Sequence, residues 1–248
     1  MSLPAAFPCL GRQSVRGRII VDKKLIEMNQ EEKEMYCKEI LRETQKKFGD
    51  SVALAFSGGK DSTVLLHLVR TLFDGKIPWK VFTLDTGAEF KEIKEFMRKL
   101  SGEWGFDLIT LRNKEVPDMV APTQDKAECC YLRKVIPLNA AIVDHNLKAL
   151  VTAVRWDEQS ARVDDEFFTS KETPPHVRVQ PMLHFRELDI WSYIKKYSIP
   201  YCELYKKGYR SIDCEPCTNP FGMAGMERGG RDPDKDRVME SLREAGYF

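Results

Sequence analysis

The stretch Val52-Ala53-Leu54-Ala55-Phe56-Ser57-Gly58-Gly59-Lys60-Asp61-Ser62 decides the fold of this chain. Its apolar run leads into two glycines, and a helical pattern of apolar residues follows over 63–72. This order predicts a buried strand, a tight turn and the N-terminus of a helix. Two glycines let the backbone curl around an anion, and the first-turn amides donate to it with the helix dipole behind them. The stretch therefore predicts a phosphate-binding loop, and an ordinary glycine-rich turn is the alternative.

The side chains of this loop indicate which phosphate compound it binds. Lys60 adds a mobile positive charge, and Ser57 and Ser62 add hydroxyl donors. Asp61 is unexpected beside phosphates, because they repel a carboxylate unless a Mg²⁺ ion lies between. The spacing is not that of the P-loop, in which four residues separate the glycines before Gly-Lys-Ser/Thr. We therefore predict a nucleoside triphosphate with Mg²⁺, and Lys60 and Asp61 as catalytic residues.

Strand and helix patterns alternate along the chain after a charged helical stretch at 30–48. Strands are predicted over 52–56, 80–84, 107–111 and 149–154, with helices over 63–72, 90–104 and 131–144 between them. An edge strand over 177–179 and an amphipathic helix over 187–197 follow, whereas 112–128 and 157–176 are polar and irregular, as substrate loops are. The alternation predicts an α/β fold: a doubly wound, mainly parallel sheet flanked by helices, with ligands at the carboxyl ends of its strands.

The second predicted strand ends in Asp85-Thr86-Gly87. At that edge of an open sheet, an acid and a glycine can meet the ribose or the base of a nucleotide. The predicted nucleotide-binding set therefore consists of Ser57, Gly58, Gly59, Lys60, Asp61, Ser62, Asp85, Thr86 and Gly87. A turn that only ends the strand is the alternative for the last three.

Composition bounds the class of protein. The chain has 248 residues, of which 42% are apolar and 31% charged, and its net charge of +1 gives no strong overall field for nucleic acid or membrane. It shows no long apolar run and no signal-peptide pattern, and its seven cysteines suggest a reducing compartment. We expect a cytoplasmic protein without a membrane partner. The predicted organisation is an N-terminal arm (1–28), a nucleotide-binding α/β domain (29–200) and a cysteine-rich C-terminal segment (201–248) that binds a cluster and closes on substrate.

Four cysteines fall into two pairs: adjacent Cys129 and Cys130, and Cys214 and Cys217 in a C-x-x-C spacing. Adjacent cysteines rarely ligate one tetrahedral ion together, because their side chains diverge, whereas a cubane spreads its ligands over several irons. Two basic residues just after the first pair, Arg133 and Lys134, would offset the charge of the thiolates. The spacing favours a [4Fe–4S] cluster, with a zinc ion or free redox thiols as alternatives. The other three cysteines, Cys9, Cys37 and Cys202, have no partner pattern.

Five arginines are candidates for binding an anionic group of the substrate: Arg155, Arg162, Arg210, Arg228 and Arg231. Arg155 and Arg162 follow the fourth predicted strand, where fork-like hydrogen bonds would suit a sulfate or phosphate group. Arg155 is also a predicted catalytic residue. A solvated, salt-bridged loop is the alternative for this pair, and a linker is the alternative for 228–231.

Two motifs resemble those of the adenosine phosphosulfate and phosphoadenosine phosphosulfate reductase family, whose fold is that of the adenine-nucleotide alpha hydrolases. They are Cys129-Cys130-Tyr131-Leu132-Arg133-Lys134 and Tyr209-Arg210-Ser211-Ile212-Asp213-Cys214-Glu215-Pro216-Cys217-Thr218. The resemblance runs from about residue 35 to the C-terminus. It implies that Cys129, Cys130, Cys214 and Cys217 ligate a [4Fe–4S] cluster.

The chain departs from these reductases in two respects. They attack the sulfur of the bound nucleotide with a cysteine in a Glu-Cys-Gly context, whereas this chain has Glu244-Ala245-Gly246 and no cysteine after Cys217. It also keeps the complete Ser-Gly-Gly-Lys-Asp-Ser loop of ATP pyrophosphatases. The tail, from Glu227-Arg228-Gly229-Gly230-Arg231 to Gly246-Tyr247-Phe248, resembles that of the small, ATP-splitting subunit of bacterial sulfate adenylyltransferase. Because it combines the complete loop with the cluster motifs, the chain is similar to the ATP pyrophosphatases of DNA phosphorothioation and to cluster-bearing tRNA thiolation enzymes.

The leading hypothesis is an ATP pyrophosphatase that adenylates an oxyanion acceptor and releases pyrophosphate, with ATP, Mg²⁺ and a [4Fe–4S] cluster as cofactors. The acceptor would be sulfate or a nucleic-acid group that undergoes phosphorothioation or thiolation. One alternative is a phosphosulfate reductase that produces sulfite, and another is a non-catalytic nucleotide and redox sensor. Besides adenine nucleotide, the resemblance implies as partners a GTPase-like large subunit, a cysteine desulfurase or DNA-modification subunits, and it is compatible with a homodimer.

Overall fold

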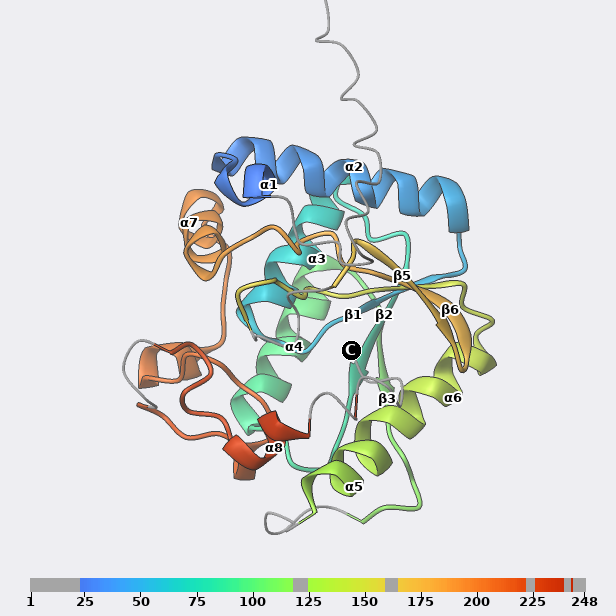
Figure 1. Cartoon of the computed structure of the whole chain (residues 1–248), viewed down its shortest axis with the longest axis vertical. Coiled ribbons are helices and arrows are strands. Elements are labelled where there is room, and N and C mark those ends of the chain that lie inside the picture. Colours follow the sequence, from blue (N-terminus) through green and yellow to red (C-terminus); the bar gives the residue numbers. More distant parts are fainter. Residues whose placement is uncertain (1–22, 118–124, 159–164, 222–225, 239–241, 243–248) are drawn as a thin grey trace, which may run out of the picture.

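The computed structural model describes residues 23–117, 125–158, 165–221, 226–238 and 242 (Figure 1). Its strands form one sheet in the order β3-β2-β1-β4-β6-β5. Five of them run parallel, and the sixth, β5 (Phe168–Glu172), pairs antiparallel with β6. The parallel strands are β1 (Val52–Ala55), β2 (Lys80–Leu84), β3 (Leu108–Leu111), β4 (Ala149–Val151) and β6 (Pro175–Val179). This sheet confirms the predicted fold class.

The strand order places a ligand site at the end of β1. The chain runs from β1 outward to β3 and then returns to β4 on the other side of β1. The topological switch point therefore lies between β1 and β4, where open α/β sheets bind their ligands. The predicted phosphate loop follows β1 directly, so it lies at this point.

Helices cover both faces of the sheet (Figure 1). One face packs against α2 (Gln30–Phe48), α3 (Lys60–Leu72), α4 (Lys91–Trp104) and α7 (Glu187–Tyr197), and the other packs against α6 (Ile136–Asp144). Helix α2 begins at a capping box in which Asn29 and Glu32 bond to each other's backbone amides. The short helices α5 (Lys126–Cys130) and α8 (Pro233–Arg237) lie next to each other beyond the carboxyl ends of the strands. A π-helical turn, Tyr131–Val135, joins α5 to α6.

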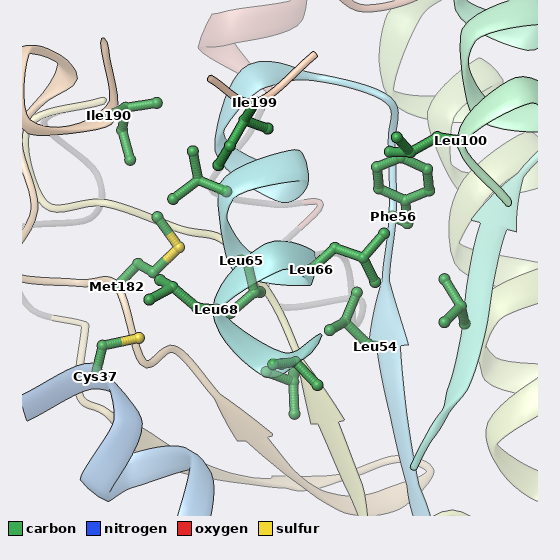
Figure 2. Packing of buried hydrophobic residues seen from close by; sticks show 14 of the residues in the cluster. Cys37, Leu54, Phe56, Leu65, Leu66, Leu68, Leu100, Met182, Ile190 and Ile199 are labelled. Atoms are coloured by element: carbon green, nitrogen blue, oxygen red, sulfur yellow. The ribbon is translucent and has the colours of Figure 1, made fainter. Parts of the chain in front are cut away.

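The larger core lies between the sheet and α3. Figure 2 shows Leu65, Leu66 and Leu68 of α3 between Leu54 and Phe56 of β1 on one side and Met182 on the other. Burying each such side chain stabilises the fold by about 1.5–3 kcal/mol. Cys202 and Leu204, which lie beyond the predicted domain boundary at residue 200, belong to the same core. The cluster of apolar residues on the α6 face is smaller.

Four segments differ from the prediction. The predicted edge strand over 177–179 is β6, which lies inside the sheet between β4 and β5. The stretch 157–176 is not wholly irregular, because its end forms a hairpin of β5 and β6; β5 escaped notice because its sequence, Phe-Thr-Ser-Lys-Glu, is mostly polar and none of its residues is buried. Within the predicted N-terminal arm, α1 (Lys23–Glu27) buries Leu25 against Val154 and Leu183. Helix α3 starts at Lys60, inside the loop. Among the helices of the described residues, none has the length and apolar character needed to cross a bilayer.

Candidate functional site

A pocket opens at the carboxyl ends of β1, β2 and β4, as the switch point predicts. The loop 57–62 forms one side of it, the segment 211–214 forms another, and Arg228 and Arg231 reach it from the C-terminal segment. Ile93, Met97 and Leu138 provide an apolar wall. A pocket with an apolar wall and a few converging polar groups is suited to a small ligand such as a nucleotide.

The loop has the shape of an anion-binding turn. Gly58 has a φ of +72°, and a Cβ atom there would lie 2.9 Å from Cγ of Met97, so a larger residue would be strained and crowded. The hydroxyl of Ser62 donates to the carbonyl oxygen of Gly59 (3.0 Å), which closes the turn. The amide of Lys60 donates to the hydroxyl of Tyr205 (2.9 Å), so this tyrosine from the C-terminal segment is part of the loop structure.

Two cations and two carboxylates meet beside the loop. The Lys60 ammonium contacts the carboxylate of Glu227 and lies 3.2 Å from that of Asp61. The Arg155 guanidinium contacts the same two carboxylates. Only 1% of Lys60 and none of Arg155 is exposed. Burial lowers the pKa of Arg155, but the surrounding carboxylates, Glu227 first, raise it more, so the guanidinium remains charged.

The four predicted anion-binding arginines that the structure describes divide into three groups. Arg228 and Arg231 line the pocket, within 3.7 Å of Glu158 and 3.1 Å of Asp213 respectively. Arg155 does not line the pocket, and its buried guanidinium contacts the carboxylates of Asp61 and Glu227. Arg210 does not line the pocket, and its half-exposed side chain pairs with Glu187 (2.6 Å). Arg162 lies outside the described residues.

The segment Asp85-Thr86-Gly87 contributes one residue to the pocket. Thr86 lines it, and its amide and hydroxyl both donate to Glu89 (2.6 and 2.5 Å). Asp85 does not line it: its carboxylate accepts from the Gly87 amide (2.9 Å) and pairs with Arg112 (3.2 Å). Burial raises the pKa of Asp85, but these bonds, Glu89 and Lys94 lower it to about 2. For Asp85 and Gly87 the strand-terminating turn is therefore the better interpretation.

The four cysteines of the two motifs surround one small cavity beside this pocket. Cys129, Cys130, Cys214 and Cys217 all line it. Thr86, Lys134 and Cys214 line both the cavity and the pocket. The hydroxyl oxygen of Thr86 lies 3.3 Å from the sulfur of Cys214. The cysteine cavity and this pocket therefore adjoin.

Cations gather around the cysteine cavity. Lys126, Arg133, Lys134 and Lys235 line it together with the sulfurs. Asp213, whose side chain is only 9% exposed, accepts from Lys134 (2.6 Å) and pairs with Arg231 and Lys235. Burial raises the pKa of Asp213, but Lys134, Lys235 and Arg231 hold it well below its ordinary value. These cations favour negative charge on the sulfurs, whereas burial acts against it and raises the pKa of Cys130 and Cys217.

The arrangement of the cysteines fits a cluster better than a single ion. Among the described residues, no three His, Cys, Asp or Glu side chains are close enough to hold one metal ion. A [4Fe–4S] cubane takes one thiolate at each iron, so its ligands stand farther apart than those of tetrahedral zinc. The four cysteines that line one cavity match the number of thiolate ligands that such a cluster takes.

The remaining described thiols belong to the core. Cys37 and Cys202 are 0% and 1% exposed, and burial raises the pKa of each. Neither is a thiolate at neutral pH, and thiolates rather than thiols are the nucleophiles in proteins. Cys9 lies outside the described residues.

Comparison with known proteins identifies the family. Residues 51–220 match the phosphoadenosine phosphosulfate reductase domain, so the chain belongs to that family. It is 33% identical over 196 residues to adenosine 5'-phosphosulfate reductase 1 of Bacillus subtilis, which covers 74% of this chain and 80% of that protein. The fold resembles the phosphoadenylyl-sulfate reductase of Candida auris, with a TM-score of 0.63 and 20% identity over 80% of this chain and 98% of that one. It also resembles the FMN adenylyltransferase of Candida glabrata, with a TM-score of 0.61 and 22% identity over 79% and 68% of the two chains.

Sequence reasoning missed several residues of the site. Glu227, Tyr205, Glu89 and Asp213 all contact its predicted members. For Glu227 and Asp213 a signal existed, since both lie inside quoted motifs. For Tyr205 and Glu89 the sequence contains no signal, because only the folded structure shows that they lie near the site.

Proposed function

We propose that the chain is an adenine-nucleotide enzyme of sulfur metabolism that binds ATP with Mg²⁺ and transfers the adenylyl group to an oxyanion. The acceptor oxygen forms a bond to the α-phosphorus, the bond from that phosphorus to the β-bridging oxygen breaks, and pyrophosphate leaves with the electron pair. Membership of the family and the names of its relatives support the nucleotide and the link to sulfur.

The observation that carries the proposal is the charge balance of the pocket. Its described lining contains four cations and four carboxylates: Lys60, Lys134, Arg228 and Arg231 against Asp61, Glu89, Glu158 and Asp213. A triphosphate entering alone would meet no net positive charge and would face carboxylates. A divalent cation held by Asp61 would offset the negative charge of the carboxylate and the phosphates.

Three groups of this chain would carry the reaction. The loop amides and Lys60 would hold the phosphate oxygens and offset the charge that develops on the leaving pyrophosphate. Asp61 would hold Mg²⁺, whose chemistry is to bridge and neutralise the phosphates. Arg155, which is buried behind Asp61, would keep its carboxylate in place.

The cysteine cavity would hold a [4Fe–4S] cluster through Cys129, Cys130, Cys214 and Cys217. Such a cluster supplies electron-transfer chemistry or a fixed negative charge when it is bound. Because the cavity adjoins the nucleotide pocket through Thr86 and Lys134, the cluster would lie beside the substrate.

Reduction of a phosphosulfate is the second candidate, and the names of the curated relatives favour it. Such a reductase needs a thiolate to attack sulfur. The thiols described outside the cluster set, Cys37 and Cys202, are buried in the core. The burial of these two thiols favours adenylyl transfer. Reduction would require Cys9 or a partner protein to supply the nucleophile.

Anaerobically purified protein separates the candidates. Radiolabelled adenosine phosphosulfate and its 3′-phosphorylated form should leave no label on the protein and give no sulfite with thioredoxin. A labelled cysteine that disappears in Cys9→Ser or Cys202→Ser would establish the reductase instead. Pyrophosphate release from ATP that survives Cys9→Ser, Cys37→Ser and Cys202→Ser would support adenylyl transfer.

A further inference from the structure

Tyr205 binds the first amide of α3, at the edge of the nucleotide pocket. Its hydroxyl oxygen accepts a hydrogen bond from the Lys60 amide (2.9 Å), and the residue lines the pocket. The next two amides of the helix, those of Asp61 and Ser62, have no acceptor within the part of the chain that the structure describes. The phenol oxygen therefore lies beside the open donors with which a helix N-terminus binds an anion.

The hydroxyl of Tyr205 still has a proton to donate. A phenol can accept one hydrogen bond and donate another, and the Lys60 amide uses only its accepting capacity. No group among the described residues accepts the phenol proton. Burial is the main cause that raises the pKa of Tyr205, so the proton stays on the oxygen at neutral pH. The acceptor is therefore water or a ligand in the pocket.

The ring of Tyr205 is held in position by its neighbours. The rings of Trp191, from α7, and Tyr201 meet it edge to face, with centroids 5.4 and 6.3 Å away. The ammonium of Lys60 lies 5.7 Å from the centroid of the Tyr205 ring. A hydroxyl on a ring held in this way is preorganised, because little side-chain freedom remains to be lost when a ligand binds.

The surroundings of this hydroxyl favour an oxyanion as its acceptor. The helix α3 directs the positive end of its dipole at the phenol oxygen, and the bond from the Lys60 amide polarises the O–H group. A hydrogen bond to a charged oxygen is roughly twice as strong as one between neutral groups. A phosphate oxygen would therefore gain more from this donor than a neutral atom of a base or a sugar.

We propose that Tyr205 is a ligand-binding residue whose hydroxyl donates to a phosphate oxygen of the nucleotide while it accepts from the Lys60 amide. The phenol extends the donors of the helix N-terminus by one group and joins the C-terminal segment to the ligand. No atom of Tyr205 enters the reaction. The inference rests on the proposed nucleotide in this pocket and is independent of the reaction that the nucleotide undergoes.

Calorimetry of the full chain with Mg²⁺-ATP and with adenosine tests this bond. Tyr205→Phe keeps the ring and its aromatic contacts and removes only the hydroxyl. The dissociation constant for Mg²⁺-ATP should rise about tenfold, as expected when one hydrogen bond to a charged group is lost. The dissociation constant for adenosine, which has no phosphate, should change by less than about twofold, which also shows that the rest of the pocket is intact.

Tyr201→Phe is the matched control. Tyr201 belongs to the same aromatic group, with its ring centroid 5.4 Å from that of Trp191, but it does not line the nucleotide pocket. Removing its hydroxyl should leave the dissociation constants for Mg²⁺-ATP and for adenosine unchanged.

Three results with Tyr205→Phe would overturn the proposal. Tighter binding of Mg²⁺-ATP would show that the phenol blocks the Lys60 amide and must leave before a phosphate can bind. Equal losses for Mg²⁺-ATP and adenosine would show that Tyr205 supports the pocket without contacting phosphate, and unchanged affinity for both would show that the bond is absent.

The proposed function can fail separately from this inference. Binding of Mg²⁺-ATP by the unmodified chain without release of pyrophosphate would overturn the proposed reaction, whereas the tenfold loss in Tyr205→Phe would still support the bond. An unmodified chain that binds neither Mg²⁺-ATP nor adenosine would overturn the inference together with the proposed nucleotide.

Discussion

The ammonium of Lys60 contacts the carboxylate of Glu227, 167 positions farther along the chain. The phosphate loop and the C-terminal segment therefore form one site. Glu227 also contacts Arg155, so one carboxylate is shared by the two most deeply buried cations of the site. An anionic ligand that approaches Lys60 must either displace Glu227 or arrive with a cation.

Asp61→Asn should weaken binding of Mg²⁺-ATP more than binding of AMP. The amide keeps the shape of the side chain but loses the charge that holds the metal, and we expect the dissociation constant for Mg²⁺-ATP to rise about tenfold, or about 1.4 kcal/mol. Calorimetry with both nucleotides measures this. An equal loss of affinity for Mg²⁺-ATP and for AMP would indicate a monophosphate site and favour the reductase.

Glu227→Gln should make the pocket accept anions without metal. Removing this carboxylate leaves Lys60 and Arg155 with less negative charge around them, so AMP should bind about tenfold tighter in the absence of Mg²⁺. Glu103→Gln, at a side chain 48% exposed on α4, is the control and should change nothing. If AMP affinity falls in Glu227→Gln, then Glu227 supports the ligand and does not compete with it.

Arg155→Met should destabilise the fold. The change leaves Asp61, Asp157 and Glu227 without the buried cation that they share, and breaking such a network costs about 3–5 kcal/mol. Arg155→Lys keeps the positive charge but lacks the forked guanidinium that reaches all three carboxylates. Its free energy of unfolding should therefore fall by less than that of Arg155→Met. Urea unfolding measures both. A midpoint unchanged in Arg155→Met would show that this network contributes little to stability.

Acid should destabilise the protein through His184. Its ring is buried against Tyr36, Phe167 and Phe185, and its Nε2 lies 3.1 Å from the carbonyl oxygen of Lys33. Burial is the main cause that lowers its pKa from 6.5 to about 4. The unfolded chain therefore binds the proton more readily, and stability falls as the pH drops from 6.5 to about 4, by up to about 3 kcal/mol.

The measurement is the free energy of unfolding against pH in the unmodified chain and in His184→Gln. In His184→Gln most of the pH dependence of the unfolding free energy between pH 6.5 and 4 should disappear. In His145→Gln, which changes an exposed histidine, it should remain. An equal slope in the unmodified chain and His184→Gln would show that another group controls the acid response.

The sequence predicts the parts of the site that are local in the chain. The glycine turn after β1 and the two cysteine pairs are recognisable because each combines residue types at a fixed short spacing. What it does not predict is which distant side chains complete them. The position of Arg155 after a strand predicts that it binds substrate, but the sequence does not predict that its guanidinium contacts the carboxylates of Asp61 and Glu227. The edge strand β5 was missed because half-exposed polar residues leave no apolar pattern.

The most direct test of the account is the fate of ATP labelled at the α-phosphate. Anaerobically purified protein is incubated with it and Mg²⁺, with sulfate, DNA or tRNA as acceptor, and the products are separated. The account predicts pyrophosphate together with labelled AMP or an adenylated acceptor, and loss of both in Lys60→Met and Asp61→Asn. No pyrophosphate with any acceptor, together with sulfite formed from adenosine phosphosulfate, would contradict it and establish a reductase.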